Sequence, residues 1–455
     1  MNRPTVVVIG AGSAGLAAAH RFTSLDAGRL IVLESSRRLG GKISAVELDG
    51  RMLDAGPESF ITRNPAAIRL CEELGLGDEL VAPAPLGALI WVRNRLRPLP
   101  KDLALGVPRD MRALATSGAI SPLGLARAAL EGILPVKIPN GDLSVGELVR
   151  RRFGNEVFEA VVDPLLSGIY AGNADRLSAE SVVPHLVDAL RQGRSLMSVE
   201  VPTRTGPPFL TLRGGLGNLV DAIAGTLPAG SVRLGEAAVD ISRHKAGYGI
   251  TLSSGQEVQA DAIVLATPPH ISAALLKSLS PPAARLLAGI ESVPVATIAL
   301  QYPQGRVTLP AATGFLVPRR EARLLVGCTF LSQKWPELGG HGGTLIRCAV
   351  GREGSSSWRA LDDDQLLGAL QADLREITGI TAEPEVFTVR RFDDGIPQYH
   401  VGHKQRVEEI EGLLEDLPGF ALAGAAYHGV GLPSCIAGGR LAAEKAAEAL
   451  RMVVA

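Results

Sequence analysis

Cysteine is scarce in this chain, and its spacing matches no metal or redox motif. The 455 residues contain only four cysteines, Cys71, Cys328, Cys348 and Cys435, and no two of them form a CxxC pair. Disulfide-rich domains carry more cysteines over fewer residues, and common zinc sites use closely spaced pairs. Nothing in the sequence therefore demands a disulfide or a zinc centre.

An excess of either charge sign is also missing. The 46 basic residues nearly cancel the 47 acidic ones, leaving a formal net charge of −1. Proteins that bind a phosphate backbone concentrate Lys and Arg, whereas the dense basic run Arg150 to Arg152 is interpreted as the solvated start of a helix. We expect no nucleic-acid partner. Apolar residues make up 46% of the chain, which predicts a large core and two or three domains.

Long uncharged apolar runs are absent from the sequence. The run that comes closest to a membrane span, from Ile120 to Val136, is interrupted by Arg127 and Glu131. This excludes a transmembrane helix but leaves open peripheral membrane contact by an interfacial helix. Met1 to Pro4 lead directly into an apolar strand, without the apolar region and cleavage site of a signal peptide. We therefore expect a cytoplasmic protein.

The start of the chain contains a glycine-rich turn between a strand and a helix. Gly10 to Gly15 read Gly-Ala-Gly-Ser-Ala-Gly, after a β-branched run and before an Ala-rich helical segment. In a GxGxxG motif the glycines allow a tight turn, close approach of a pyrophosphate and packing of the helix on the strand. Glu34 ends the next apolar run, about 20 residues further on, where an acid binds ribose hydroxyls. The pattern predicts a dinucleotide site for an unphosphorylated ribose.

The α/β pattern is interrupted twice and resumes at the C-terminus. Residues 87–193 contain helical segments broken by Pro and Gly, and residues 268–403 contain alternating strand-like stretches. The last apolar strand and helix repeat the pattern of the first. The sequence thus predicts an α/β protein, α+β overall, with a discontinuous Rossmann-like dinucleotide-binding domain (1–86, 205–267 and 404–455), an inserted helical region (87–204) and a mixed-sheet substrate domain (268–403).

Further motifs resemble those of a known family and indicate that the dinucleotide is FAD. The discontinuous Rossmann-like domain is therefore expected to be an FAD-binding domain. Arg38 to Lys42 (Arg-Leu-Gly-Gly-Lys) and Asp54 to Pro57 (Asp-Ala-Gly-Pro) resemble FAD enzymes of the amine oxidase and glutathione reductase type. Along nearly its whole length the chain resembles the FAD-dependent protoporphyrinogen and coproporphyrinogen oxidases. The motifs that carry this resemblance are Arg152-Phe153-Gly154, Gly168 to Asn173 (Gly-Ile-Tyr-Ala-Gly-Asn), Gly395 to Tyr399 (Gly-Ile-Pro-Gln-Tyr) and Leu422 to Gly431.

The resemblance also implies the residues of the site. Gly168 and Tyr170 are expected on the substrate side of the flavin. No catalytic acid or base and no metal is expected, because a flavin itself accepts the hydride. The residues expected to contact FAD are Gly10, Ala11, Gly12, Ser13, Ala14, Gly15, Glu34, Ser35, Gly41, Lys42, Gly56, Pro57, Glu58, Ser59, Val239, Gly429, Val430 and Gly431.

The reaction implied by the resemblance is a step of haem biosynthesis. A porphyrinogen would lose six electrons to O₂ in three two-electron oxidations, with release of hydrogen peroxide. A chain without a membrane span suits the soluble branch found in Gram-positive bacteria, which favours coproporphyrinogen III as substrate. Protoporphyrinogen IX is the alternative, and a flavin-free escort protein on the same fold is a third hypothesis, against which the intact glycine fingerprint argues.

The sequence departs from its relatives at two positions, and other candidate sites have simpler interpretations. Ala88 stands where mitochondrial relatives carry an Arg that serves a substrate propionate, and Phe392 replaces a common Trp. His400 and His403 have no nearby carboxylate in the sequence and are interpreted as surface or packing residues. Asp362 to Asp364 are interpreted as a helix start, where carboxylates are favourable.

Overall fold

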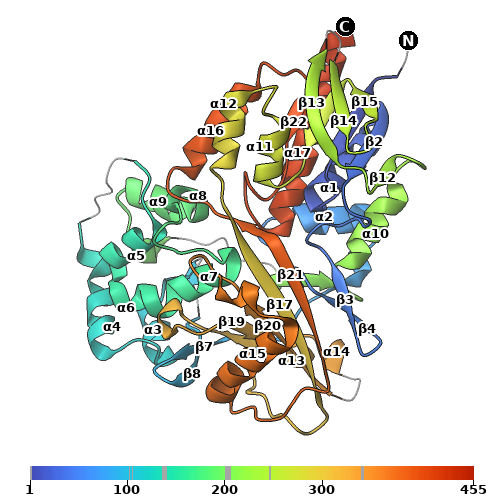
Figure 1. Ribbon diagram of the computed structural model, residues 1–455. Helices are drawn as coiled ribbons and strands as arrows, with labels where there is room; N and C mark the ends of the chain where they lie inside the picture. Colours follow the sequence, from blue (N-terminus) through green and yellow to red (C-terminus); the bar gives the residue numbers. More distant parts are fainter. Residues whose placement is uncertain are drawn as a thin grey trace.

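Figure 1 shows the computed structural model of the chain, which describes residues 3–101, 103–104, 106–135, 141–199, 206–244, 247–339 and 343–454. Val136, which ends the longest apolar run, lies outside the described residues, as do residues 1, 204, 205 and 455 at the predicted domain bounds. Among the helices of the described part, none combines the length and apolar character needed to cross a bilayer.

A five-stranded sheet joins the two ends of the chain. All its neighbouring strands are parallel, and their order is β12 (Val232–Leu234), β2 (Arg29–Glu34), β1 (Thr5–Ile9), β16 (Ala262–Leu265) and β22 (Phe420–Leu422). The Val-Val-Val-Ile run of β1 after Thr5 is apolar and buried because both faces of the sheet are covered. The edge at which parallel strands end is where such sheets bind ligands.

Two different layers cover this sheet. Val6 and Val8 face a core that includes α1 (Ser13–Leu25), α2 (Ala66–Glu73), α10 (Gly217–Thr226) and α17 (Leu432–Val454). Val7 and Ile9 face the opposite core, which includes the antiparallel sheet of β13 (Ala238–His244), β14 (Gly247–Leu252) and β15 (Glu257–Ala260), together with α11 (Pro269–Leu275), α12 (Pro281–Ala288) and α16 (His403–Leu414). The Asn64 side chain accepts the Ala66 N–H, the first of α2, at 3.0 Å.

A seven-stranded mixed sheet forms the other large β layer (Figure 1). Its order is β21 (Val386–Pro397), β17 (Ser292–Pro303), β20 (Gly343–Val350), β19 (Leu325–Thr329), β18 (Gly314–Leu316), β7 (Leu89–Val92) and β8 (Arg95–Pro98). The last two strands come from the region expected to be helical. Ile90 and Val92 face the helical core while Trp91 faces the core of the sheet, so β7 is buried on both sides and its four residues show no polar alternation.

The inserted region also contains a short antiparallel pair, β9 (Leu103–Ala104) and β10 (Val107–Pro108), and the rest of its regular structure is helical. It contains α3 (Met111–Ser117), α4 (Pro122–Ala129), α5 (Val145–Phe153), α6 (Asn155–Val157), α7 (Asp163–Tyr170), α8 (Ala179–Val182) and α9 (Pro184–Arg191). The run Arg150 to Arg152 lies in the last turn of α5, so its predicted place at a solvated helix start is wrong. Arg152 is buried and donates to Glu131 Oε1 at 2.7 Å, because a fully buried carboxylate requires a paired cation.

The predicted helix start at Asp362 is confirmed. The Asp362 carboxylate accepts the Gln365 N–H at 2.8 Å, and the Gln365 side chain accepts the Asp362 N–H at 3.1 Å. This reciprocal capping box begins α15 (Asp363–Thr378), whose Leu366, Leu370 and Leu374 pack on the seven-stranded sheet.

Candidate functional site: a dinucleotide cleft beside the substrate segment

The turn between β1 and α1 needs its three glycines for different reasons. A Cβ on Gly10, whose φ is +97°, would lie 2.7 Å from the Ala266 carbonyl oxygen, and one on Gly15 would lie 1.8 Å from the Gly10 oxygen. Around Gly12, in contrast, no atom of the described residues lies within 4 Å of the corresponding position. No side chain caps the start of α1. Backbone N–H groups beside open space at an uncapped helix start fit a pyrophosphate.

Glu34 ends β2 beside this turn. Its Oε2 accepts the Ala11 N–H at 2.8 Å and its Oε1 accepts the Ser36 N–H at 2.8 Å. Each carboxylate oxygen can accept a second bond, so both remain able to receive ribose hydroxyls. The neighbouring Ser35 is exposed, and Val239, at the start of β13, is 52% exposed. Glu236, three residues before Val239, donates its N–H to the Glu34 carbonyl oxygen at 3.0 Å, which brings the segment leading into β13 to the end of β2.

The second glycine pair packs directly against the first motif. A Cβ on Gly41, whose φ is +57°, would lie 2.9 Å from the Gly12 Cα, and one on Gly56 would lie 1.9 Å from the Lys42 carbonyl oxygen. Arg38 holds this loop by donating to the carbonyls of Gly41 and, at 3.1 Å, of Ile43. The sequence analysis assigned no role to Arg38, although its position in the Arg-Leu-Gly-Gly-Lys motif could have indicated one.

The C-terminal segment meets the N-terminal motif at the same point. Gly429 to Gly431 precede α17, which crosses α1 so closely that a Cβ on Gly439 would lie 2.0 Å from the Ala14 oxygen. Cys435, in the first turn of α17, lies beside Ser13 and near Lys42. The Lys42 side chain is exposed at its surface, and the atoms packed around it lower the pKa of its amine by desolvation.

Two cations, one from α13 (Leu331–Lys334) and one from the seven-stranded sheet, bind the side chain of Glu58. Its buried carboxylate pairs with Lys334, at the end of α13, and with Arg347 of β20 at 3.0 Å. Burial opposes ionisation, but the two cations outweigh it and lower the pKa of Glu58. Arg347 also donates to the backbone oxygens of Asp54 and Gly56 at 2.9 and 3.0 Å. The side chain of Glu58 is thus committed to fixing the 54–59 loop, and the half-buried Pro57 and Ser59 lie beside it.

The Ile-Pro-Gln-Tyr motif links the substrate segment to the C-terminal flavin segment. Gln398 donates to the Tyr170 carbonyl oxygen at 2.8 Å. Tyr399 packs its ring 5.9 Å from that of Tyr170, and its hydroxyl donates to the Ala425 oxygen at 2.6 Å and accepts the Gly429 N–H at 2.7 Å. Burial raises the pKa of Tyr170 to about 12, so this phenol stays protonated. The motif therefore sets the distance between the end of α7 and Gly429.

The end of α7 faces open space with apolar and cationic neighbours. Gly168 is exposed, Ile169 is 44% exposed, and Val430 packs against the same helical core as Tyr170. The cation of Arg63 lies within electrostatic range of both Tyr170 and His185. Within the described chain no carboxylate forms an ion pair with Arg63, and the buried Nε2 of His185 has no hydrogen-bond partner. An anionic group bound near the end of α7 could therefore accept hydrogen bonds from Arg63 and His185.

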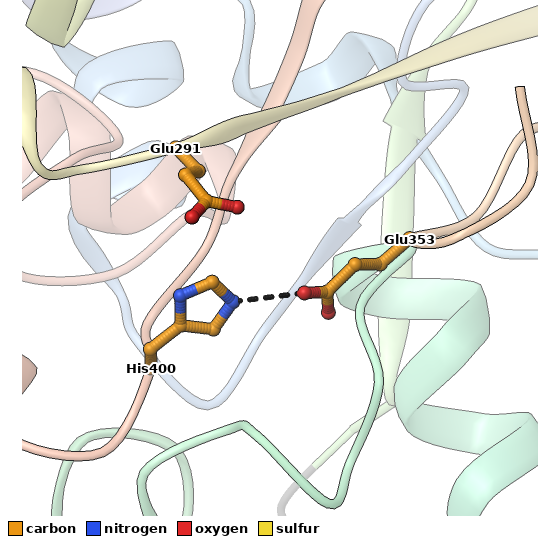
Figure 2. Close-up of side chains that lie close together, drawn as sticks. All are labelled: Glu291, Glu353 and His400. Atoms are coloured by element: carbon orange, nitrogen blue, oxygen red, sulfur yellow. Dashed lines mark hydrogen bonds and ion pairs between the residues drawn. The ribbon is translucent and has the colours of Figure 1, made fainter.

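A cluster of charged groups contacts the turn that follows α7, and Figure 2 shows three of its members, Glu291, Glu353 and His400. His400 Nε2 lies 3.1 Å from Glu353 Oε1, and Glu291 approaches the same imidazole. The expectation that His400 has no carboxylate partner is therefore wrong, because folding brings in two acids from distant turns. Arg176 supplies the positive charge of the cluster, through a contact with Glu353 and another at 3.6 Å with Glu291. The cluster is an ion-pair network that holds the turn after Tyr170.

His403 is a packing residue, as expected. It is 1% exposed and stacks on Tyr399 with ring centroids 4.0 Å apart and an interplanar angle of 12°. Burial is the main cause that lowers the pKa of His403 to about 4. The neutral imidazole therefore supports the ring whose hydroxyl holds Gly429.

Comparison with known proteins identifies the family to which this arrangement belongs. A family model described as flavin containing amine oxidoreductase matches residues 13–447. The chain belongs to the flavin-containing amine oxidoreductase family. This flavoenzyme is an FAD-dependent oxidoreductase, and the open space at Gly12 and the close-packed glycine pairs fit that cofactor.

Several relatives of this flavoenzyme match it over nearly its whole length. It is 36% identical to a coproporphyrinogen III oxidase of Bacillus subtilis (strain 168), with 97% of each chain covered. It is 34% identical to a coproporphyrinogen III oxidase of Propionibacterium freudenreichii, covering 98% of this chain and 91% of that one. A crystal structure assigned as a protoporphyrinogen oxidase from Exiguobacterium sp. 255-15 superposes with a TM-score of 0.88 and 32% identity, covering 98% of this chain and 99% of that chain.

Proposed function

We propose that this flavoenzyme oxidises coproporphyrinogen III to coproporphyrin III. Three molecules of O₂ would accept the six electrons and six hydrogens that the substrate loses, and three molecules of hydrogen peroxide would leave. The observation that carries the proposal is full-length similarity, at 30–36% identity, to relatives named for this activity, joined to an intact FAD cleft.

The residues around the cleft have distinct proposed roles. FAD, when bound, supplies the hydride acceptor. The open backbone at Gly12 and the start of α17 would hold its pyrophosphate, Glu34 its ribose, and Lys42 would line the inner part of the cleft. The chain contributes orientation and exclusion of water, since a protonated Tyr170 and the buried Tyr399 offer no base at neutral pH. We therefore assign no catalytic acid or base.

The substrate side would bind a large apolar ring that carries carboxylates. Gly168 is exposed at the end of α7 and packs closely on Leu316, where an added Cβ would lie 3.2 Å from its Cδ2, and Ile169 and Tyr170 supply apolar contact surface. Arg63 is the proposed partner of a propionate, because no carboxylate of the described residues pairs with it and a second donor, His185, lies within its field. This assignment replaces the role that the Arg of mitochondrial relatives, here Ala88, would have had.

Protoporphyrinogen IX is the second candidate substrate. It is favoured by the 29% identity to a chloroplastic protoporphyrinogen oxidase of Nicotiana tabacum and by the name given to the Exiguobacterium structure. A flavin-free escort role is not supported, since the glycine fingerprint and the space at Gly12 are intact. All four cysteines are free and buried, which suits a reducing compartment, and we propose a cytoplasmic location.

Separate assays with the two porphyrinogens test the substrate. The yellow holoenzyme is mixed with coproporphyrinogen III or protoporphyrinogen IX under air, and porphyrin fluorescence and hydrogen peroxide are followed together. We expect a higher kcat/KM for coproporphyrinogen III and one peroxide for each pair of electrons. Equal or reversed kcat/KM values would refute the preference, and a folded protein that retains no flavin would refute the enzyme itself.

A further inference from the structure

The turn that follows α7 is held by loops of the seven-stranded sheet. The carbonyl oxygens of residues 170–172 accept hydrogen bonds, in chain order, from the Gln398 side chain at 2.8 Å, the Glu353 N–H at 2.7 Å and the Arg319 guanidinium at 2.9 Å. Gln398 follows β21, Glu353 follows β20, and Arg319 lies between β18 and β19. We call residues 170–173 the α7 turn. Three successive carbonyl groups of this turn are therefore bound from three separate loops of one sheet.

Glu353 holds the α7 turn with its side chain as well as with its backbone. Its Oε2 accepts the Asn173 N–H at 2.8 Å, and its Oε1 lies 3.1 Å from His400 Nε2 (Figure 2). The carboxylate also pairs with Arg176, and the Glu353 side chain is only 9% exposed. Because a buried charge is stable only when it is paired, these partners commit the carboxylate to the turn and its surroundings.

Arg319 contacts residues at both ends of α7. Its Nη2 donates to the Gly172 carbonyl oxygen after the helix, and its Nε lies 4.0 Å from Oδ1 of Asp163, the first residue of the helix. Its Nη1 donates to the Glu353 carbonyl oxygen at 2.7 Å. A guanidinium presents several donors in a planar fork, so one side chain can serve acceptors that the compact amine of a lysine does not match.

The conformation of the α7 turn is not one that its own sequence favours. Ala171 has a φ of +50°, in the left-handed region that residues with a Cβ rarely adopt. Residues in such conformations persist where the surrounding structure over-determines them, and they concentrate at ligand-binding sites. A Cβ on the neighbouring Gly172 would collide with the Gln398 side chain, so the turn also packs closely on the Ile-Pro-Gln-Tyr motif. The loops of the sheet, and not a local preference, therefore shape this turn.

We propose that Glu353 and Arg319 are positioning residues for the substrate. By holding the α7 turn, they place residues 168–170, the proposed apolar contact surface, where a porphyrinogen ring binds. Both residues act through the turn and not on the substrate itself, since their side chains bind backbone groups of the turn. The inference rests on the proposed function, because it assigns two further residues to the same substrate side.

Steady-state kinetics of the FAD-loaded enzyme test this role. Glu353→Ala and Arg319→Met should each raise KM for coproporphyrinogen III about tenfold and change kcat less than about twofold, because a displaced turn weakens contacts that substrate and transition state share. Loss of the negative charge at Glu353 would by itself lower KM for a substrate that carries carboxylates. A rise in KM for Glu353→Ala therefore reports the position of the turn and not the charge of the side chain.

Two further variants separate positioning from general destabilisation. Glu353→Gln keeps an oxygen that can accept the Asn173 N–H, so its KM should lie between those of the wild type and Glu353→Ala. Glu156→Ala is the matched control. Glu156 also accepts a backbone N–H, from Ser121 at 2.8 Å, and pairs with Arg93 at 2.6 Å, but these partners lie outside the α7 turn. The KM of Glu156→Ala should equal that of the wild type.

Hydrogen exchange of the substrate-free holoenzyme gives a measurement that does not depend on the substrate. Amides of residues 168–176 should exchange at least about tenfold faster in Glu353→Ala than in the wild type or in Glu156→Ala, because the Asn173 N–H loses its acceptor and the turn opens locally. The FAD content should be the same in all variants, since the cleft is bound by other residues.

The inference is overturned if Glu353→Ala or Arg319→Met keeps the wild-type KM, if exchange in residues 168–176 does not change, or if Glu156→Ala raises KM equally. A wild type that oxidises neither porphyrinogen would refute the proposed function and, with it, the substrate role of Glu353. Faster exchange in that case would still establish that Glu353 holds the turn, so the two failures can be distinguished.

Discussion

The dinucleotide cleft and the substrate side are built in different ways. The cleft is assembled from short motifs whose residues act within a few positions of one another, such as the glycines of 10–15, the loop around Gly41 and Arg38 that holds it. The substrate side depends on contacts between residues more than 200 positions apart, such as the hydrogen bond of Gln398 and the ring contact of Tyr399 with Tyr170. Cofactor binding can therefore be predicted from short sequence motifs, whereas substrate recognition depends on contacts that form only in the folded chain.

The glycine motif allows the largest test of this comparison. Gly15→Leu should prevent folding or cost more than about 4 kcal/mol, because its Cβ would overlap the Gly10 carbonyl. The yield of soluble protein and the free energy of unfolding in urea measure this effect. A variant with wild-type stability would contradict the packing role of this glycine.

Gly12→Leu is the matched control within the same motif. The space at Gly12 is open, so the apoprotein should fold with a stability within about 1 kcal/mol of the wild-type apoprotein. FAD, however, should be lost, because the side chain would occupy the pyrophosphate position. Absorbance at flavin wavelengths and calorimetric titration with FAD distinguish the two effects, and retained tight FAD binding would count against the cleft.

The buried ion pairs of Glu58 provide the corresponding test for long-range assembly. Glu58→Gln should destabilise the holoenzyme by about 3 kcal/mol, because Lys334 and Arg347 would keep their charges without a buried partner. Glu47→Gln, at an exposed position, should change stability by less than about 0.5 kcal/mol. Equal unfolding midpoints for the two variants would contradict the role of Glu58 in joining the sheet to the cleft.

The stack of His403 on Tyr399 predicts a pH dependence. The pKa of His403 is lowered to about 4 in the folded chain from 6.5 in an unfolded one. The contribution of neutral His403 to the free energy of unfolding is therefore complete above pH 6.5. It is lost as pH falls towards 4, by on the order of 3 kcal/mol. His403→Phe keeps an aromatic ring without this titration. Chemical unfolding of both proteins from pH 7 to 4 should reveal a difference that changes in this direction, and a constant difference would refute it.

Arg63 gives the smallest expected effect and tests the substrate side directly. Arg63→Met should raise KM for coproporphyrinogen III about tenfold and change kcat less than about twofold, since it removes a charged hydrogen bond to bound substrate. FAD content should not change. Arg69→Met replaces an exposed Arg of α2 and should leave KM unaltered. The same KM in both variants would remove Arg63 from the proposed substrate contacts.

The sequence predicted the return of the C-terminus to the first domain, but it did not predict all strands of the inserted region. The recurrence of strand and helix at residues 420–450 predicted that the C-terminus completes the first domain, and Cys435 does lie beside Ser13. The strands β7 and β8 were missed, because four residues of β7 buried on both faces have no alternating pattern. Burial on two sides removes the signal from which strands are recognised.

The sequence by itself determined the features that depend on neighbours within about 20 residues: the glycine turn, the acid at Glu34, the helix start at Asp362 and the charges that interrupt the apolar run from Ile120 to Val136. Tertiary structure determined which charged side chains are buried or paired and which partners they have. It buried Arg152 on Glu131, brought Glu353 to His400, and turned Arg127 inward so that α4 presents an uncharged face. A charge is identical in sequence whether it meets water or a partner, and only folding determines which of the two stabilises it.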